Sequence, residues 1–169
     1  DDEGLQDSLM LQINADGTLK LCKEFLKTID IENADAAMAP RKLINISSVG
    51  GGISAFPGFR LSDGMSKAAV AFLTRQLAAE TVHSPVNVFA VCPGATDTPM
   101  FQASTLSKMT SQERVVFEKR LPKGRLIKPA DITSVVHFLA TDLAQVMHGA
   151  VIDASMGLGV RPGLQTEAN

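Results

Sequence analysis

Apolar residues recur at helical spacing in the first part of the chain. Between residues 5 and 29 they repeat every three or four positions, which predicts one long amphipathic helix. The stripe consists of Leu5, Leu9, Ile13, Leu19, Cys22, Leu26 and Ile29. Asn14 and Gly17 lie in the middle of this helix, although both are weak helix formers. Residues 30–40 are polar and alanine-rich up to Pro40, and they predict a loop.

Two further helices are expected. One spans residues 62–80, and its inward side chains are predicted to be Met65, Ala69, Phe72, Leu73, Leu77 and Ala78. The other begins at Pro129, because proline suits the first helical position. Residues 95–120 between them are polar and predict only short amphipathic helical turns.

Three short apolar runs predict buried strands at residues 42–47, 86–92 and 150–154. The second is nearly continuous in apolar residues, as expected of a strand covered on both faces. Helices and strands therefore alternate along the chain. This order predicts an α/β layer fold with a parallel sheet.

Composition narrows the function classes. The 169 residues are 45% hydrophobic and 20% charged, with a formal net charge of -2, which fits one globular domain. Mixed acids and bases argue against a nucleic-acid partner, and no apolar run approaches the roughly 20 residues of a membrane span. The acidic start is unlike a signal peptide. With only two cysteines, nothing in the sequence requires an oxidising compartment, so a cytoplasmic location is expected.

The spacing of the cysteines and histidines along the sequence does not predict a metal site. Cys22 and Cys92 are far apart and are expected to be small buried residues. The three histidines are scattered, which favours structural roles. The chain contains no tyrosine. It begins without methionine, which fits a fragment, a processed product or a trimmed chain.

Five segments, in the right order, resemble the second half of classical short-chain dehydrogenases/reductases. They match the mid-helix asparagine motif, the strand that delivers the catalytic serine, the Tyr-x-x-x-Lys segment, the strand and Pro-Gly loop that meet the nicotinamide, and the final strand. The segments are residues 13–17, 45–50, 63–69, 88–98 and 149–153. The resemblance implies a single partial Rossmann-like domain over residues 1–169, with half of a doubly wound parallel sheet in three α/β/α layers. It also implies a flap at about residues 96–124 and a C-terminal tail at 158–169.

The resemblance implies a catalytic role for four positions. Asn14 would break its helix locally and bind a relay water. Ser48, with Ser47 as the alternative, would hydrogen-bond a substrate carbonyl. Lys67 would hold the nicotinamide ribose and lower the pKa of the proton donor. Asp63 stands four residues before Lys67, at the position of the family's tyrosine.

The family uses NAD or NADP, and the resemblance places Pro93, Gly94, Thr96 and Thr98 near that cofactor, together with Lys67. Simpler readings exist for single residues: a helix irregularity at Asn14, turn residues at Ser47 and Ser48, and a solvated Lys67. Only the joint pattern favours common ancestry over these readings.

Two departures limit the function that the resemblance implies. An aspartate has an ordinary pKa near 3.9 and no proton to donate at neutral pH, unlike a tyrosine at about 10. We expect Asp63 to pair with Lys67 or Arg60, or, as a lesser alternative, to act as a general base. The family's glycine-rich phosphate loop is missing, and Gly50-Gly51-Gly52 has the wrong place and spacing to replace it.

Three hypotheses follow. The first is an impaired member of the family, retained for binding or assembly and without a bound NAD(P). The second is a fragment of an NAD(P)-dependent carbonyl or 3-oxoacyl reductase with a small carbonyl or alcohol substrate. The third is a non-enzymatic interaction subunit. In each case, we expect a homo-oligomer through helices 5–29 and 62–80 and neither nucleic acid nor membrane as a partner.

Overall fold

The structure is a computed structural model that describes residues 2–29 and 40–160. Its centre is a parallel sheet of three strands in the order β1-β2-β3. The strands are β1 (Arg41–Ile46), β2 (Val86–Pro93) and β3 (Val151–Ala154). Leu43 is opposite Val88, and Ala90 is opposite Val151.

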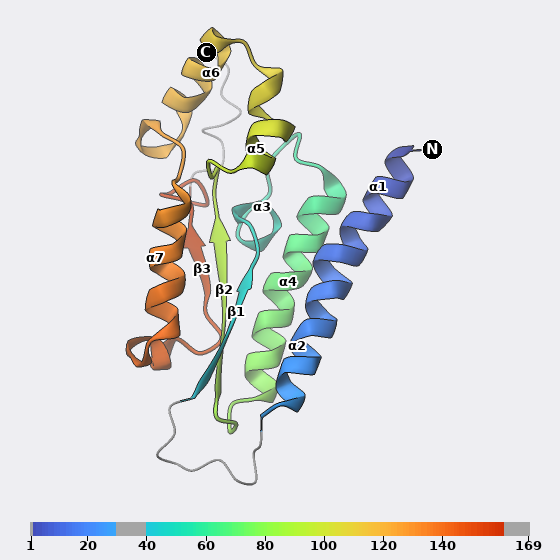
Figure 1. Cartoon of the computed structure of the whole chain (residues 1–169), viewed down its shortest axis with the longest axis vertical. Coiled ribbons are helices and arrows are strands. Elements are labelled where there is room, and N and C mark those ends of the chain that lie inside the picture. Colours follow the sequence, from blue (N-terminus) through green and yellow to red (C-terminus); the bar gives the residue numbers. More distant parts are fainter. Residues whose placement is uncertain (1, 30–39, 161–169) are drawn as a thin grey trace.

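Helices cover both faces of the sheet, as Figure 1 shows. One layer holds α1 (Asp2–Leu11), η1 (Gln12–Gly17), α2 (Thr18–Lys27) and α4 (Leu61–Glu80). The other holds α7 (Pro129–Ala140), followed by η4 (Asp142–Met147). The short elements beyond the strand ends are α3 (Val49–Gly52), α5 (Pro99–Ser104), η2 (Leu106–Lys108), α6 (Ser111–Arg120) and η3 (Pro122–Gly124). The predicted three-layer α/β fold with a parallel sheet is confirmed.

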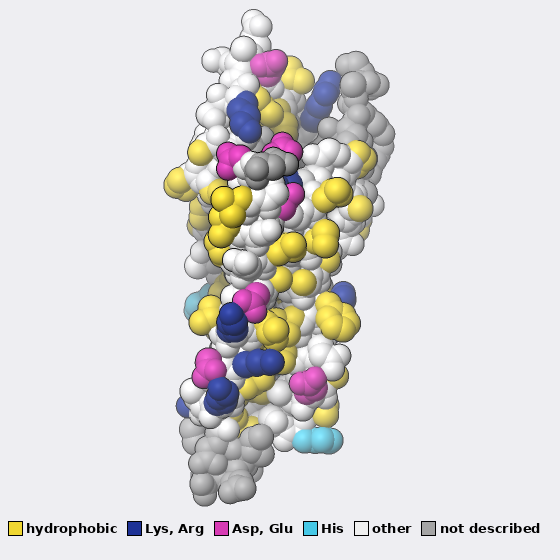
Figure 2. Space-filling model, turned by 90° about the vertical axis from the view of Figure 1, so that its right-hand side faces the viewer, with side chains coloured by type: hydrophobic (Ala, Val, Ile, Leu, Met, Phe, Trp, Pro, Cys, Tyr) yellow, Lys and Arg dark blue, Asp and Glu magenta, His cyan; other side chains and the backbone are white. Residues whose placement is uncertain are grey.

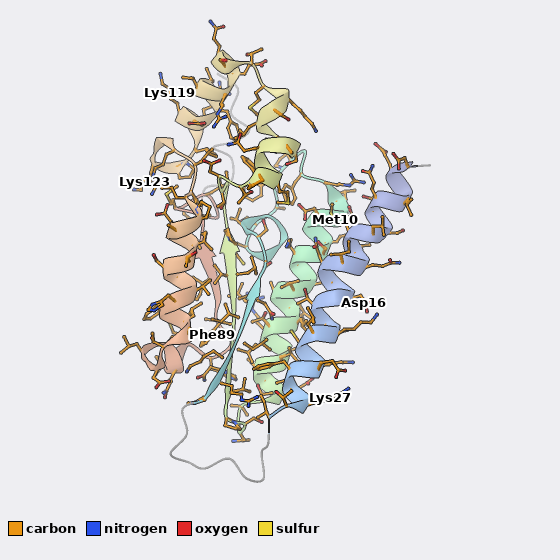
Figure 3. The ribbon with its side chains drawn as sticks, in the orientation of Figure 1. Met10, Asp16, Lys27, Phe89, Lys119 and Lys123 are labelled. Atoms are coloured by element: carbon orange, nitrogen blue, oxygen red, sulfur yellow. The ribbon has the colours of Figure 1, made fainter. Side chains whose placement is uncertain are left out.

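The central strand β2 explains the core. Alternate side chains point to opposite faces of a strand, so Val86 and Val88 pack towards Cys22 and Leu77, on α2 and α4. Phe89 and Val91 pack on the other face against Leu139 of α7. The place of Phe89 inside the sandwich is visible in Figure 3. Each such fully buried side chain contributes about 1.5–3 kcal/mol.

The predicted helix at 5–29 is a continuous rod from Asp2 to Lys27 with a π-helical segment in its middle. The π segment contains both Asn14 and Gly17, the two weak helix formers. Most of the predicted stripe in the first half of this rod faces outwards: Leu5, Leu9 and Ile13 are 60%, 44% and 68% exposed. The predicted loop at 30–40 lies outside the described residues except for Pro40.

The predicted inner face of α4 is partly wrong. Met65 and Phe72 are 61% and 65% exposed, and Ala69 is exposed too. The buried residues of α4 are smaller: Ser62, Ser66, Val70, Ala71, Thr74, Leu77 and Ala78. Small side chains allow the helix to lie close to the sheet, and hydroxyl groups can be buried there because each finds a hydrogen-bond partner.

His148 has the structural role that was expected. Its Nδ1 accepts a hydrogen bond from the backbone N–H of Val88 at 3.1 Å, and its Nε2 lies 2.9 Å from the carbonyl oxygen of Ala78. The ring thereby joins α4, β2 and the turn before β3. No helix within the described residues has the length and apolar character needed to cross a membrane.

Candidate functional site

Three loops meet at the carboxyl ends of the strands, the usual ligand-binding edge of a parallel α/β sheet. They follow β1, β2 and β3 at residues 47–54, 94–98 and 155–160. Gly94 packs against Ser155, and the hydroxyl of Ser54 donates to the carbonyl oxygen of Gly159 at 2.7 Å. The amide of Gly159 in turn donates to the hydroxyl of Ser155 at 3.0 Å. The loops therefore form one connected unit.

The loop after β1 delivers Ser48. Its hydroxyl accepts a hydrogen bond from the amide of Gly50 at 3.2 Å and so caps α3. Gly51 has φ +87°, and a Cβ there would overlap the carbonyl oxygen of Gly64. The loop thus lies directly on the first turn of α4, the turn that carries Asp63.

The neighbouring glycines allow equally close contacts. A Cβ on Gly50 would lie 2.9 Å from the ring of Phe59, and a Cβ on Gly52 would lie 2.6 Å from Oγ of Ser47. Gly51 therefore holds the Ser48 loop against α4, while Gly50 and Gly52 allow its contacts with Phe59 and Ser47. The three glycines are not part of a phosphate-binding loop.

Ser47, the alternative to Ser48, is occupied by a structural contact. It is buried, and its hydroxyl donates to the carbonyl oxygen of Lys67 at 2.7 Å. Burial raises the pKa of the nearby Cys92 thiol, and a hydrogen bond with Ser47 opposes this. Of the two serines, Ser48 is the more accessible, and it is half-buried.

Asn14 reaches α4 from the π-helical segment. Its Nδ2 donates to the hydroxyl of Ser66 at 3.1 Å, and that hydroxyl donates to the backbone oxygen of Asp63 at 2.8 Å. Ser66 is fully buried. Asn14 is therefore linked to the turn that holds Asp63 and Lys67, although its role in a proton relay stays a prediction.

The expected ion pair of Asp63 is wrong. Among the described residues, the Asp63 carboxylate has no partner within ion-pair or hydrogen-bond distance, and Lys67 also forms no ion pair. Arg60 pairs with Asp7 instead, with 2.7 Å between Nε and Oδ1. The hydroxyl of Ser62 donates to the same oxygen at 2.5 Å. These hydrogen bonds, from Ser62 first and Arg60 second, lower the pKa of Asp7.

The predicted cofactor residues follow β2. The hydroxyl of Thr96 donates to the carbonyl oxygen of Gly94 at 3.0 Å. Thr98 caps α5 by accepting from the amide of Phe101 at 3.2 Å, and Pro99 occupies the first position of that helix. Pro93 is the last residue of β2. Both threonines are thus fixed at the strand's carboxyl end, beside the loop after β3.

The predicted flap is more regular than expected. Residues 95–120 form α5, η2 and α6, where only short helical turns were predicted. Leu106, Leu121 and Leu126 form a separate small core beneath them. The base of the flap is closed by two backbone hydrogen bonds. The amide of Asp97 donates to the carbonyl oxygen of Ile127 at 2.8 Å, and the amide of Ile127 donates to the carbonyl oxygen of Ala95 at 2.9 Å. The part of the tail at 161–169 lies outside the described residues.

The residues present suit only one end of a dinucleotide. The family resemblance places the nicotinamide at the carboxyl ends of the strands. The residues it assigns to this place are Pro93, Gly94, Thr96, Thr98 and Lys67. The sequence contains no glycine-rich strand-to-helix turn that would hold the pyrophosphate. No group of three or more potential ligands within the described residues is placed to hold a metal ion.

Comparison with known proteins gives a consistent picture. The galactitol 2-dehydrogenase of Rhizobium johnstonii is 31% identical over 149 residues, which cover 88% of this chain and 54% of the relative. Among solved structures, the Pseudomonas aeruginosa RhlG/NADP active-site complex has a TM-score of 0.76 at 28% identity and covers 88% of this chain and 56% of that one. The 3-oxoacyl-[acyl-carrier protein] reductase of Brucella melitensis in complex with NAD has a TM-score of 0.74 at 26% identity, with coverages of 89% and 56%.

The chain therefore spans about half the length of these relatives. A family model described as enoyl-(acyl carrier protein) reductase matches residues 5–159. That match includes all three strands and every candidate site residue. This chain belongs to the short-chain dehydrogenase/reductase family.

Proposed function

We propose that the 169-residue chain is a member of this family without carbonyl reductase activity of its own, and that it serves in binding or assembly. This proposal depends on the aspartate at position 63. It stands four residues before a half-buried Lys67, where the family resemblance places the tyrosine, and the chain contains no tyrosine. An aspartate at neutral pH has no proton to give to a carbonyl oxygen.

The same geometry supports retained ligand binding. Gly51 against Gly64 holds the Ser48 loop on the turn of Asp63, and the Asn14–Ser66 hydrogen bond supports that turn from behind. Ser48 and Lys67 are both half-buried and are available to a small carbonyl or alcohol ligand. Such a site can position a ligand without transferring hydride, which needs a positioned nicotinamide.

Assembly would use the outer side of the helical layer. Figure 2 shows hydrophobic side chains gathered on this face. The exposed apolar residues of α1, η1 and α4 include Leu5, Leu9, Ile13, Met65 and Phe72. We propose that two copies pack these helices against one another, since a two-fold interface is self-complementary. A non-enzymatic interaction subunit would use this same surface.

A second candidate is part of a complete NAD(P)-dependent carbonyl or 3-oxoacyl reductase. The coverage of only 54–56% of the relatives favours it, as do the NADP and NAD named in the neighbouring structures. The intact mass of the native protein separates the candidates. A mass of 17.9 kDa supports the first. A mass near ~27 kDa, that of a full doubly wound domain, supports the second.

Titration of the chain with NADH and NADPH tests the first candidate directly. We expect no saturable binding and no ketone reduction, and we expect the same for Asp63→Tyr because its new phenol still lacks a positioned hydride donor. Stoichiometric binding at micromolar concentration, or turnover by the variant, would show that the site is complete. Denaturation curves of both proteins serve as the folding control.

A further inference from the structure

Positive charge is concentrated in one segment of the chain, residues 106–128, named here the basic arm. It carries seven Lys and Arg against two Glu. The other 146 residues carry nine Lys and Arg against 16 Asp and Glu. The net charge of -2 is therefore the sum of a strongly cationic basic arm and an acidic remainder of the chain. Such an uneven distribution produces a local potential that steers charged partners.

Both glutamates of the basic arm are committed to contacts within it. Glu113 forms the capping box of α6, where its carboxylate accepts from the amide of Thr110 at 2.7 Å. Glu118 pairs with Arg114 at 2.8 Å. Lys108, Lys119 and Lys123 are exposed and form no ion pair within the described part of the chain. Their charges are therefore available at the surface.

Two of these lysines share one edge of the molecule. Lys119 lies in the last turn of α6, and Lys123 follows in η3 with a positive φ of 62°. The turn between them is closed by the Gly124 amide, which donates to the carbonyl oxygen of Leu121 at 2.9 Å. Figure 3 shows both lysines on the outer edge of the flap, on the side away from α1 and α2.

An apolar groove of about 360 Å³ lies along α6, the helix that also carries Lys119. It is lined by Gln112, Glu113, Val116, Phe117, Arg120 and Leu121. Val116 is 48% exposed, and its neighbour Val115 is 53% exposed. A ligand that fits this surface needs an apolar side for the groove and negative charge for the lysines.

We propose that the basic arm docks an acidic amphipathic helix of a partner protein, with apolar side chains in the groove and carboxylates at Lys119 and Lys123. Helix-in-groove binding of this kind uses an apolar stripe at helical spacing. Nucleic acid fits less well, because the ring of Phe117 packs on Phe101 with 6.3 Å between centroids and is not free to stack on bases. A membrane surface fits less well because valines replace the large apolar residues of interfacial helices.

Fluorescence anisotropy with a labelled synthetic helix, leucine on one face and glutamate on the other, tests the proposal on the full chain. Binding should weaken as salt rises from about 0.01 M to about 0.15 M, since the Debye length falls from ~30 Å to ~8 Å. Lys119→Glu with Lys123→Glu should raise Kd by more than about tenfold. The control, Lys23→Glu with Lys27→Glu on α2, changes the net charge equally and should leave Kd unchanged.

Val116→Ser should weaken binding of the peptide without changing its salt dependence, because it alters only the groove. The proposal is overturned if the peptide does not bind, if both lysine pairs reduce binding equally, or if Val116→Ser has no effect. It is also overturned if single-stranded DNA or phosphatidylserine vesicles bind more tightly than the peptide.

Discussion

The two sides of α4 differ in the size and polarity of their side chains. The side towards the sheet carries small and polar residues, such as Ser66, Thr74 and Ala78, and all three are buried. The outer side carries Met65 and Phe72, which are mostly exposed. Hydrophobicity alone would place Met65 and Phe72 on the inner side, beside Val70 and Leu77.

The difference shows what each side has to do. The inner side must bring the Ser48 loop, β1 and α4 within close contact, and this requires glycine, alanine and hydroxyl groups with satisfied hydrogen bonds. The outer side has no such partner within the described chain. Large apolar residues there are suited to a second copy.

Gly51→Ala should have the largest effect, because it forces apart the closest contact on the inner side. The new Cβ would overlap the carbonyl oxygen of Gly64, and φ at this position is +87°. The left-handed backbone costs about 1–2 kcal/mol and overpacking about 1–3 kcal/mol. We expect a loss of about 2–5 kcal/mol in the free energy of unfolding, measured by urea denaturation.

Gly58→Ala is the matched control for this change. Gly58 also has a positive φ, +75°, but no atom lies within 4 Å of its Cβ position. It should show the backbone cost alone, about 1–2 kcal/mol. Equal losses for the two variants would mean that the contact between Gly51 and Gly64 has no energetic importance.

Phe72→Glu should break assembly and leave the subunit folded. Phe72 is 65% exposed, so its replacement removes contact area from the proposed interface and none from the core. A central aromatic residue of an interface contributes about 2 kcal/mol or more, which corresponds to at least a tenfold weaker dimer. Light scattering measures the mass, and circular dichroism checks the fold.

Leu143→Glu is the control for assembly, because Leu143 is 79% exposed on η4, away from α4. It should not change the mass of the assembly. A wild-type monomer at tens of micromolar would refute the proposed oligomer. Unfolding by Phe72→Glu would contradict the exposed position of this residue.

Thr74→Val should cost about 1–3 kcal/mol, although the two side chains have nearly the same shape. The Thr74 hydroxyl accepts from Nδ2 of the buried Asn45 at 3.0 Å. Valine leaves that amide without its partner, and an unsatisfied buried donor is costly. Thr81→Val is the control, since Thr81 only donates to the carbonyl oxygen of Leu77. Thermal denaturation should show the smaller loss for the control.

Local patterns predicted the strands well and the sides of the helices less well. The apolar run of β2 predicted a strand covered on both faces. In the structure, every residue from Val88 to Cys92 is inaccessible to solvent. The same reasoning placed Phe72 inside, because hydrophobicity does not report how closely two backbones approach. The α6 helix was expected only as short helical turns, although the capping box from Thr110 to Glu113 marks a helix start in the sequence.

The sequence did not predict which residues far apart along the chain form hydrogen bonds or ion pairs. The weak helix formers around Asn14 indicated an irregular helix, and the structure has a π-helix there. Nothing local shows that Asn14 bonds Ser66, 52 positions away. Likewise, Arg60 was expected to pair with Asp63 in its own neighbourhood. It pairs with Asp7, because the start of α4 packs against α1 in the fold.

That last contact gives the smallest predicted effect. Hydrogen bonds from Ser62 and Arg60 lower the pKa of Asp7 below its ordinary 3.8. Because the folded-state pKa is the lower one, the stabilisation is present above pH 3.8 and is lost as the pH falls through the folded value. Asp7 is half-exposed, so solvent keeps the effect small.

The free energy of unfolding of the wild type should therefore fall more steeply below pH 3.8 than that of Asp7→Asn. Ser62→Ala should remove part of the same dependence, and the double variant should add little to Asp7→Asn, because both changes act on one carboxylate. Urea denaturation across the acidic range measures the slopes, and parallel curves for wild type and Asp7→Asn would show that the contact between α1 and α4 does not depend on this charge.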